Sequence, residues 1–232
     1  MFTSIKRLIL IGFAISLLQG CVPMQGKELR IQNLAKSQVD MIVDGHIKTI
    51  NEYSRELTIK LYKRNPRELA KAAPGTTIEK RLKQLLGEPR PIQHKELNNL
   101  YGLKALPLAF DENYKGDRVF AFMVAVTGMV HASYNYRDEF FMLDEIDQQR
   151  LYNSARNLEK ISWQLHNLKD SKGELFILSD SMNEGIINLS YERLFGKMIA
   201  NQDHLAEIIA TSTDRTINRI VQGVATAPFL PI

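Results

Sequence analysis

The segment from Val119 to Val126 is a run of eight consecutive apolar residues, and no proline interrupts the chain from there to Tyr134. A helix that is apolar on every side is either buried at the centre of a protein or inserted in a membrane. This run is too short for the second role, because a membrane-spanning helix needs about 20 apolar residues. With Asp117 as its N-cap, we expect a helix over 118–134 that forms the centre of the core.

The segment before this run predicts a long amphipathic helix over residues 28–64. Apolar residues recur at spacings of three and four, as one buried face of a helix requires. The stripe consists of Ile31, Ala35, Val39, Ile42, His46, Ile50, Tyr53, Leu57 and Leu61.

Helix caps and periodic patterns divide the rest of the chain into further helices. They are expected over 66–73, over 76–86 with Thr76 as cap, over 95–101, from Asp144 to 168, and from Ser190 to 222. Residues 175–178 are expected to be a short strand or an extended segment, and no convincing strand pair is found. We therefore predict an all-α fold, a single bundle of five to seven helices around the buried apolar helix.

The N-terminus has the layout of an export signal. Lys6 and Arg7 precede an apolar run over 8–18, which leads into Leu17-Leu18-Gln19-Gly20-Cys21. A positive start, a short apolar core and a small residue before the cleavage point are typical of removable signals.

Leu18-Gln19-Gly20-Cys21 resembles the lipobox of bacterial lipoproteins, with Gln19 as a departure because a small residue is usual there. The resemblance implies cleavage before Cys21, a diacylglycerol on its thiol and an acyl chain on its new amine, and several chains together anchor a protein firmly. In that class an aspartate after the cysteine often holds the protein at the inner membrane. Val22 stands here, which implies an outer-membrane anchor facing the periplasm, with the inner membrane as the alternative.

These features predict a signal peptide over 1–20, a lipidated tether over 21–30 and one helical domain over 31–232. Removing the signal takes away two positive charges from a formal net charge of +4, so we expect no nucleic-acid partner. Cys21 is the only cysteine, and with its thiol acylated no disulfide can form. The domain must therefore be stabilised by apolar burial.

An aromatic corner is expected where the central helix ends. Tyr134, Tyr136, Phe140 and Phe141 lie within eight residues and enclose Arg137. Aromatic residues and arginine are favoured at protein interfaces, so these five residues are the candidate binding site. The alternative is that the aromatic side chains close one end of the core. The C-terminal segment, Phe229 to Ile232, is open to the same two interpretations, a docked tail or a partner-binding tail.

Two local patterns resemble parts of known modules, but each lacks a feature that the module requires. Asn65-Pro66-Arg67-Glu68 is similar to the junction between tetratricopeptide repeats, but no second copy lies about 34 residues away. Asp111 to Gly116 begins like a calcium-binding loop. Lys115 at its fifth position and Phe122 at its twelfth remove the oxygen ligands that calcium needs.

The histidines do not form a recognisable metal motif. His204 and Glu207 share one helical face, but a metal would need further ligands from other helices, such as His46, His131 or His166. We expect His204 and Glu207 to be solvated, and His46 and His131 to be structural. No metal and no cofactor is predicted.

The sequence favours a non-enzymatic function, because it contains no nucleophile elbow, no zinc-protease motif and no phosphate-binding loop. We expect an outer-membrane lipoprotein whose helical domain binds an envelope protein. One alternative is a carrier that holds an acyl-type ligand around residues 119–130. Another is an envelope hydrolase, which would require Asp111, Glu112, Asp117 or His131 to converge in a cleft.

Overall fold

The computed structural model describes residues 36–141, 144–183, 186–220 and 223–232. The predicted signal peptide, Cys21, the tether and residues 28–35 of the first predicted helix lie outside the described residues.

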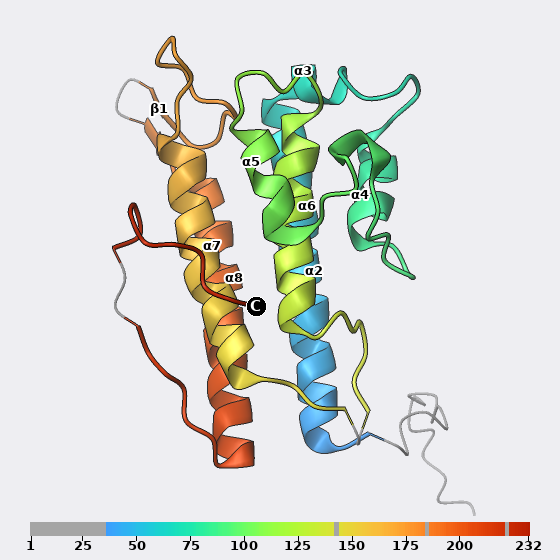
Figure 1. The fold of residues 1–232 in the computed structure, drawn as a ribbon, viewed down its shortest axis with the longest axis vertical. Coiled ribbons are helices and arrows are strands. Elements are labelled where there is room, and N and C mark those ends of the chain that lie inside the picture. The colour runs from blue at the N-terminus through green and yellow to red at the C-terminus, as the bar shows by residue number, and fades with distance from the viewer. Residues whose placement is uncertain (1–35, 142–143, 184–185, 221–222) are drawn as a thin grey trace, which may run out of the picture. The chain divides into compact units, whose positions relative to one another are not determined.

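Four long helices form an antiparallel bundle (Figure 1). They are α2 (Gln38–Arg64), α6 (Arg118–Ser133), α7 (Gln148–Asn167) and α8 (Ser190–Thr213). In Figure 1, α2 and α7 run upward while α6 and α8 run downward. Each helix packs against two of the others, in the cyclic order α2, α8, α7, α6. The predicted all-α fold is confirmed.

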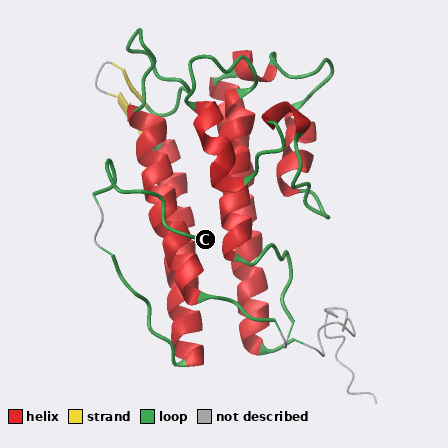
Figure 2. Ribbon diagram, in the orientation of Figure 1, coloured by secondary structure: helices red, strands yellow, loops and turns green. Residues whose placement is uncertain are grey.

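Short elements complete the fold at the ends and the side of this bundle. They are α3 (Pro66–Leu69), α4 (Ile78–Leu86), α5 (Leu106–Ala109) and the 3-10 turns η2 (Lys95–Leu97) and η3 (Gly102–Ala105). One small antiparallel pair, β1 (Ser181–Asn183) with β2 (Ile186–Asn188), lies just before α8 (Figure 2). The sequence did not predict this pair, since strands of three residues are too short to show an alternating pattern.

Helix α6 is the centre of the core, as predicted. Every residue from Val119 to Ser133 is buried. The helices α2 and α7 cover two of its sides, while α4, α5 and η3 cover the rest. Gly128 of α6 lies directly against Gly102 of η3, because a Cβ atom on Gly128 would lie 2.7 Å from the Gly102 backbone nitrogen.

A buried network of charges holds the start of α6. Asp117 caps the helix, accepting a hydrogen bond from the Phe120 backbone N–H at 2.9 Å. The same carboxylate accepts a hydrogen bond from the Tyr62 hydroxyl at 2.8 Å and lies 3.1 Å from the Arg81 guanidinium. Arg81 also stacks over the Phe120 ring and pairs with Glu96. Burial raises the pKa of Asp117 above its ordinary value, and Arg81 opposes that effect.

Several predicted boundaries of helices were wrong. Thr77 rather than Thr76 caps α4, and Asp147 rather than Asp144 caps α7. Helix α8 ends at Thr213 instead of near residue 222, because Asp214 adopts a left-handed conformation with φ of 52°. Such a conformation ends a helix, and it usually occurs at glycine or asparagine.

The buried face of α2 is also shifted from the prediction in its first half. Val43 and Ile47 are buried there, whereas Ile42 is 41% exposed. From Ile50 onward the predicted stripe is largely right, with Ile50, Leu57 and Leu61 fully buried. Adjacent apolar residues at 42 and 43 made two registers compatible with the sequence.

Candidate partner-binding groove

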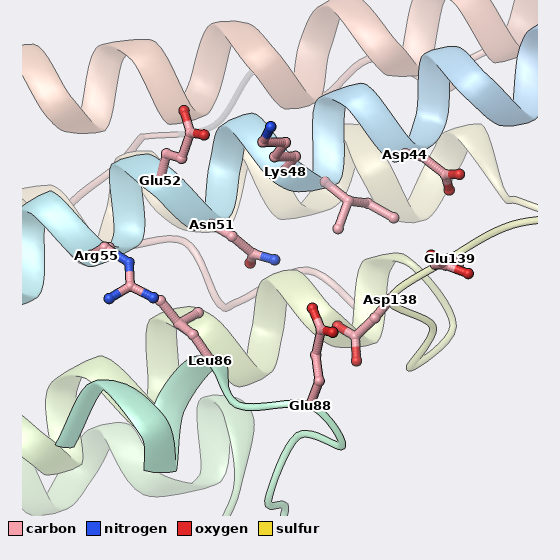
Figure 3. Close-up of a pocket in the computed structure, with 10 residues that line it drawn as sticks. Asp44, Lys48, Asn51, Glu52, Arg55, Leu86, Glu88, Asp138 and Glu139 are labelled. Carbon is pink, nitrogen blue, oxygen red and sulfur yellow. The ribbon is translucent and has the colours of Figure 1, made fainter. Parts of the chain in front are cut away.

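A groove of about 740 Å³ runs along the outer face of α2 (Figure 3). We call it the α2 groove. It is lined by Asp44, Ile47, Lys48, Asn51, Glu52, Arg55, Leu86, Glu88, Asp138 and Glu139.

The groove has walls from three separate parts of the chain. The six residues from α2 are spaced by three and by one, which places them on one helical face. Leu86 and Glu88 come from the end of α4 and the connector that follows it. Asp138 and Glu139 come from the loop after α6. Because these segments are far apart in sequence, no local pattern indicated the site.

Acidic side chains predominate in the groove, with five carboxylates against the two bases Lys48 and Arg55. In Figure 3 the carboxylates of Asp44, Glu88, Asp138 and Glu139 lie toward one end, whereas Arg55 and the carboxylate of Glu52 lie toward the other. Apolar lining is confined to Ile47 and Leu86. A groove with this composition suits a polar, charged ligand.

A buried arginine joins the walls. The side chain of Arg90 is only 4% exposed, and its Nη2 donates to Asn51 Oδ1 at 3.2 Å and to Asp138 Oδ1 at 3.1 Å. Its Nε and Nη1 atoms have no hydrogen-bond partner within the described residues. Arg90 thereby fixes one residue of α2 and one residue of the loop after α6 at the floor of the groove.

His131 stands next to this pair. Its Nδ1 lies 3.0 Å from the Tyr101 hydroxyl, and its Nε2 lies 3.9 Å from Asp138 Oδ1. Burial and the neighbouring Arg90 charge lower the pKa of His131 to about 4, although Asp138 opposes that shift. His131 is therefore neutral at pH 7, in keeping with the structural role predicted for it.

Asp44 makes a second connection between α2 and the loop after α6. It accepts a hydrogen bond from the Phe140 backbone N–H at 2.9 Å and pairs with Lys36. The side chain of Lys36 is 8% exposed and lies over the Phe141 ring. These contacts hold the loop after α6 against the first half of α2.

The structure divides the predicted aromatic corner between the core and the surface. Tyr134 and Phe140 are each 1% exposed, and the Tyr134 hydroxyl donates to Gln202 Oε1 at 3.1 Å. Tyr136 is 58% exposed, whereas Phe141 is half-buried. Arg137 pairs with Asp144 at 2.9 Å. The corner contributes Asp138 and Glu139 to the α2 groove rather than its aromatic residues.

The C-terminal segment is docked on α7. Asn157 accepts a hydrogen bond from the Leu230 backbone N–H at 2.8 Å and donates one to the Leu230 carbonyl at 2.9 Å. Asn153 donates to the Pro231 carbonyl at 2.8 Å. Of the two interpretations of this segment, the structure favours the docked tail.

The residues required for the hydrolase alternative do not converge. Asp117 and His131 lie near opposite ends of α6, about 20 Å apart along the helix axis at 1.5 Å per residue. Asp117 is 1% exposed and is occupied by its structural partners, while Asp111 and Glu112 lie on an exposed loop. No described cleft joins these four groups.

The carrier alternative required a cavity around residues 119–130. All side chains from Val119 to Val126 are 0% exposed and pack within one continuous hydrophobic core. A filled core over 119–126 argues against an acyl chain bound there, and the pocket of about 280 Å³ that Gly128 and Met129 line lies beside the C-terminal segment instead.

The other candidate metal ligands from the sequence analysis contact side chains of the same chain. His204 lies beside the ring of His46, with centroids 5.5 Å apart, and Glu207 pairs with Arg219. His46 Nδ1 lies 3.1 Å from Asn201 Oδ1. A different set, His166 with Asp180 and Glu192, is brought together where α7 ends and α8 begins, and no sequence motif indicated it.

Among the described residues, no helix is both long enough and apolar enough to cross a membrane. Comparison of the chain with protein-family models, with curated proteins and with solved structures gave no match.

Proposed function

We propose that the protein is a lipid-anchored component of the bacterial cell envelope whose helical domain binds an envelope protein through the α2 groove. The lipobox-like stretch ending at Cys21 supports the anchor, and Val22 supports an outer-membrane location facing the periplasm. The observation that carries the binding role is the α2 groove itself, whose lining is largely charged and comes from three separate parts of the chain.

The lining favours a peptide segment over an apolar ligand. Eight of the ten lining residues are polar or charged. An acyl chain would take these groups out of water without supplying hydrogen bonds, which is costly. A peptide with basic side chains toward Glu88 and Glu139 would complement the acidic majority of the lining.

The floor of the groove is organised before binding. Arg90 and Asp44 connect α2 to the loop after α6 through the contacts described above. A preformed site loses little conformational entropy when a partner binds, so more of the interaction energy appears as affinity.

The groove is tested with a defined peptide probe of alternating lysine and leucine, whose binding is followed by NMR chemical shifts. We expect shifts at Asn51 and Glu88, and an affinity that falls as salt rises. The double variant Glu88→Gln with Glu139→Gln should weaken binding about tenfold, which corresponds to about 1.4 kcal/mol.

Glu79→Gln with Glu174→Gln is the matched control, because it removes the same two charges from exposed glutamates outside the groove. Equal loss of affinity in the control and in the groove variant would show that the peptide responds only to overall charge. Shifts that map away from α2 would also refute the groove as the binding site.

The anchor is tested separately. Cys21→Ser should abolish labelling by a fatty-acid analogue and leave an uncleaved or unanchored protein. Persistent labelling of this variant would contradict the lipoprotein assignment, whereas the peptide measurement would be unaffected.

A further inference from the structure

We propose that His166, Asp180 and Glu192 form a binding site for a divalent transition-metal ion such as Zn²⁺. The three residues come from the end of α7, the segment before β1 and the first turn of α8. Their potential ligand atoms all lie within 4.8 Å of one another. This site is separate from the α2 groove and does not depend on the proposed binding function.

The ring of His166 is oriented as a metal ligand requires. Its Nδ1 lies 2.6 Å from the carbonyl oxygen of Ser162, to which it donates a hydrogen bond. A backbone carbonyl that accepts the N–H of one ring nitrogen leaves the lone pair of the other for a metal. The other nitrogen, Nε2, lies 3.1 Å from Asp180 Oδ2.

The position of Asp180 is fixed by the start of α8. Its Oδ1 accepts a hydrogen bond from the Tyr191 N–H at 3.0 Å, and its Oδ2 accepts one from the Glu192 N–H at 3.2 Å. In a tetrahedral site with bonds of about 2.0–2.1 Å, two ligand atoms are about 3.3 Å apart. The separation of His166 Nε2 from Asp180 Oδ2 is already close to that value.

Glu192 supplies the third ligand. Its side chain is 50% exposed, and its Oε1 lies 3.1 Å from His166 Nδ1. Rotation of this exposed side chain toward Nε2 would complete a set of one imidazole and two carboxylates. Water would fill the fourth position, as in zinc sites with three protein ligands.

The competing interpretation is an ion pair in which a protonated His166 bridges the two carboxylates. The two interpretations differ in a measurable way. A bound metal takes the place of the Nε2 proton. By connecting α7 to α8 it also stabilises the folded state, by an amount that rises with the logarithm of the metal concentration once that concentration exceeds the dissociation constant.

The test is titration of the metal-free mature protein with Zn²⁺ alone and with Co²⁺ alone at pH 7.5. We expect one ion per chain, a rise in Tm with Zn²⁺, and the visible absorption of four-coordinate Co²⁺. His166→Gln and Glu192→Gln should each weaken binding at least tenfold. Asp180→Asn should do the same while keeping an oxygen that can cap α8.

His204→Gln is the matched control, since His204 is an exposed histidine elsewhere on α8. Circular dichroism of each variant confirms that the fold is retained. Absence of a one-to-one complex, or equal weakening by His204→Gln, would overturn the proposal and leave the ion pair as the role of the three residues.

Discussion

The contact between Gly128 and Gly102 makes a sharp test of how α6 is packed. A Cβ atom added at Gly128 would lie 2.7 Å from the nitrogen and 2.8 Å from the Cα of Gly102. Both are backbone atoms and cannot rotate away. Gly102 itself has φ of +58°, a conformation that side chains disfavour, so neither glycine is readily replaced.

The expected magnitude follows from two opposing effects of Gly128→Ala. Replacing glycine by alanine inside a helix stabilises it by about 1 kcal/mol. Forcing an extra carbon into a tightly packed contact costs about 1–3 kcal/mol. Gly45→Ala and Gly196→Ala isolate the first effect, because both glycines are helical and neither has a neighbouring atom within 4 Å of the added carbon.

Urea unfolding of the three variants gives the comparison. We expect Gly45→Ala and Gly196→Ala to be more stable than the parent protein by up to about 1 kcal/mol. Gly128→Ala should be less stable than either control by about 1–3 kcal/mol, with an unchanged dependence on urea concentration. If Gly128→Ala is as stable as the two controls, α6 does not approach η3 as described.

Three further changes test other parts of the fold. The pKa of His131 is lowered to about 4 from an ordinary 6.5, so the folded state disfavours protonation of this side chain. The free energy of unfolding should therefore fall by up to about 3 kcal/mol between pH 6.5 and pH 4. His131→Asn should remove that part of the pH dependence measured by urea unfolding. Asp117→Ala should cost about 3–5 kcal/mol in the same assay, because it leaves Arg81 buried without one of its two acidic partners, and a loss below 1 kcal/mol would contradict the network. Asn157→Ala should cost about 2 kcal/mol and speed hydrogen exchange at Leu230, since two hydrogen bonds hold the tail; unchanged exchange would show that the tail is not docked there.

The sequence predicted the fold where one local signal was sufficient. The apolar run from Val119 identified the central helix, and Asp117 identified its cap, because both signals act within one turn. The periodic pattern also located α7, in which Leu151, Leu158 and Ile161 are fully buried. Helix ends were less predictable, because neighbouring residues such as Thr76 and Thr77 are equally good caps.

The candidate sites depend on contacts between distant segments, and no sequence pattern reports such contacts. Arg90 meets Asp138 across 48 positions of the chain. His166 and Asp180 are 14 positions apart, on either side of a turn at residues 171–173. The aromatic corner predicted from the sequence includes the loop after α6 that lines the groove, but the residues of that loop that reach the groove are its carboxylates.

The partners of two buried arginines, Arg81 and Arg90, bear on the role of the α2 groove. Arg81 lies 1% exposed beside α6, and although its Nε has no hydrogen-bond partner within the described residues, its Nη1 and Nη2 meet Glu96 and Asp117. Arg90 is almost equally buried, yet only its Nη2 is bonded, and both of its partners line the groove. A buried charge seldom adds net stability, and one with unmatched donors adds less. The arrangement at Arg90 fits the binding role proposed above, in which Asn51 and Asp138 are held in place for a partner.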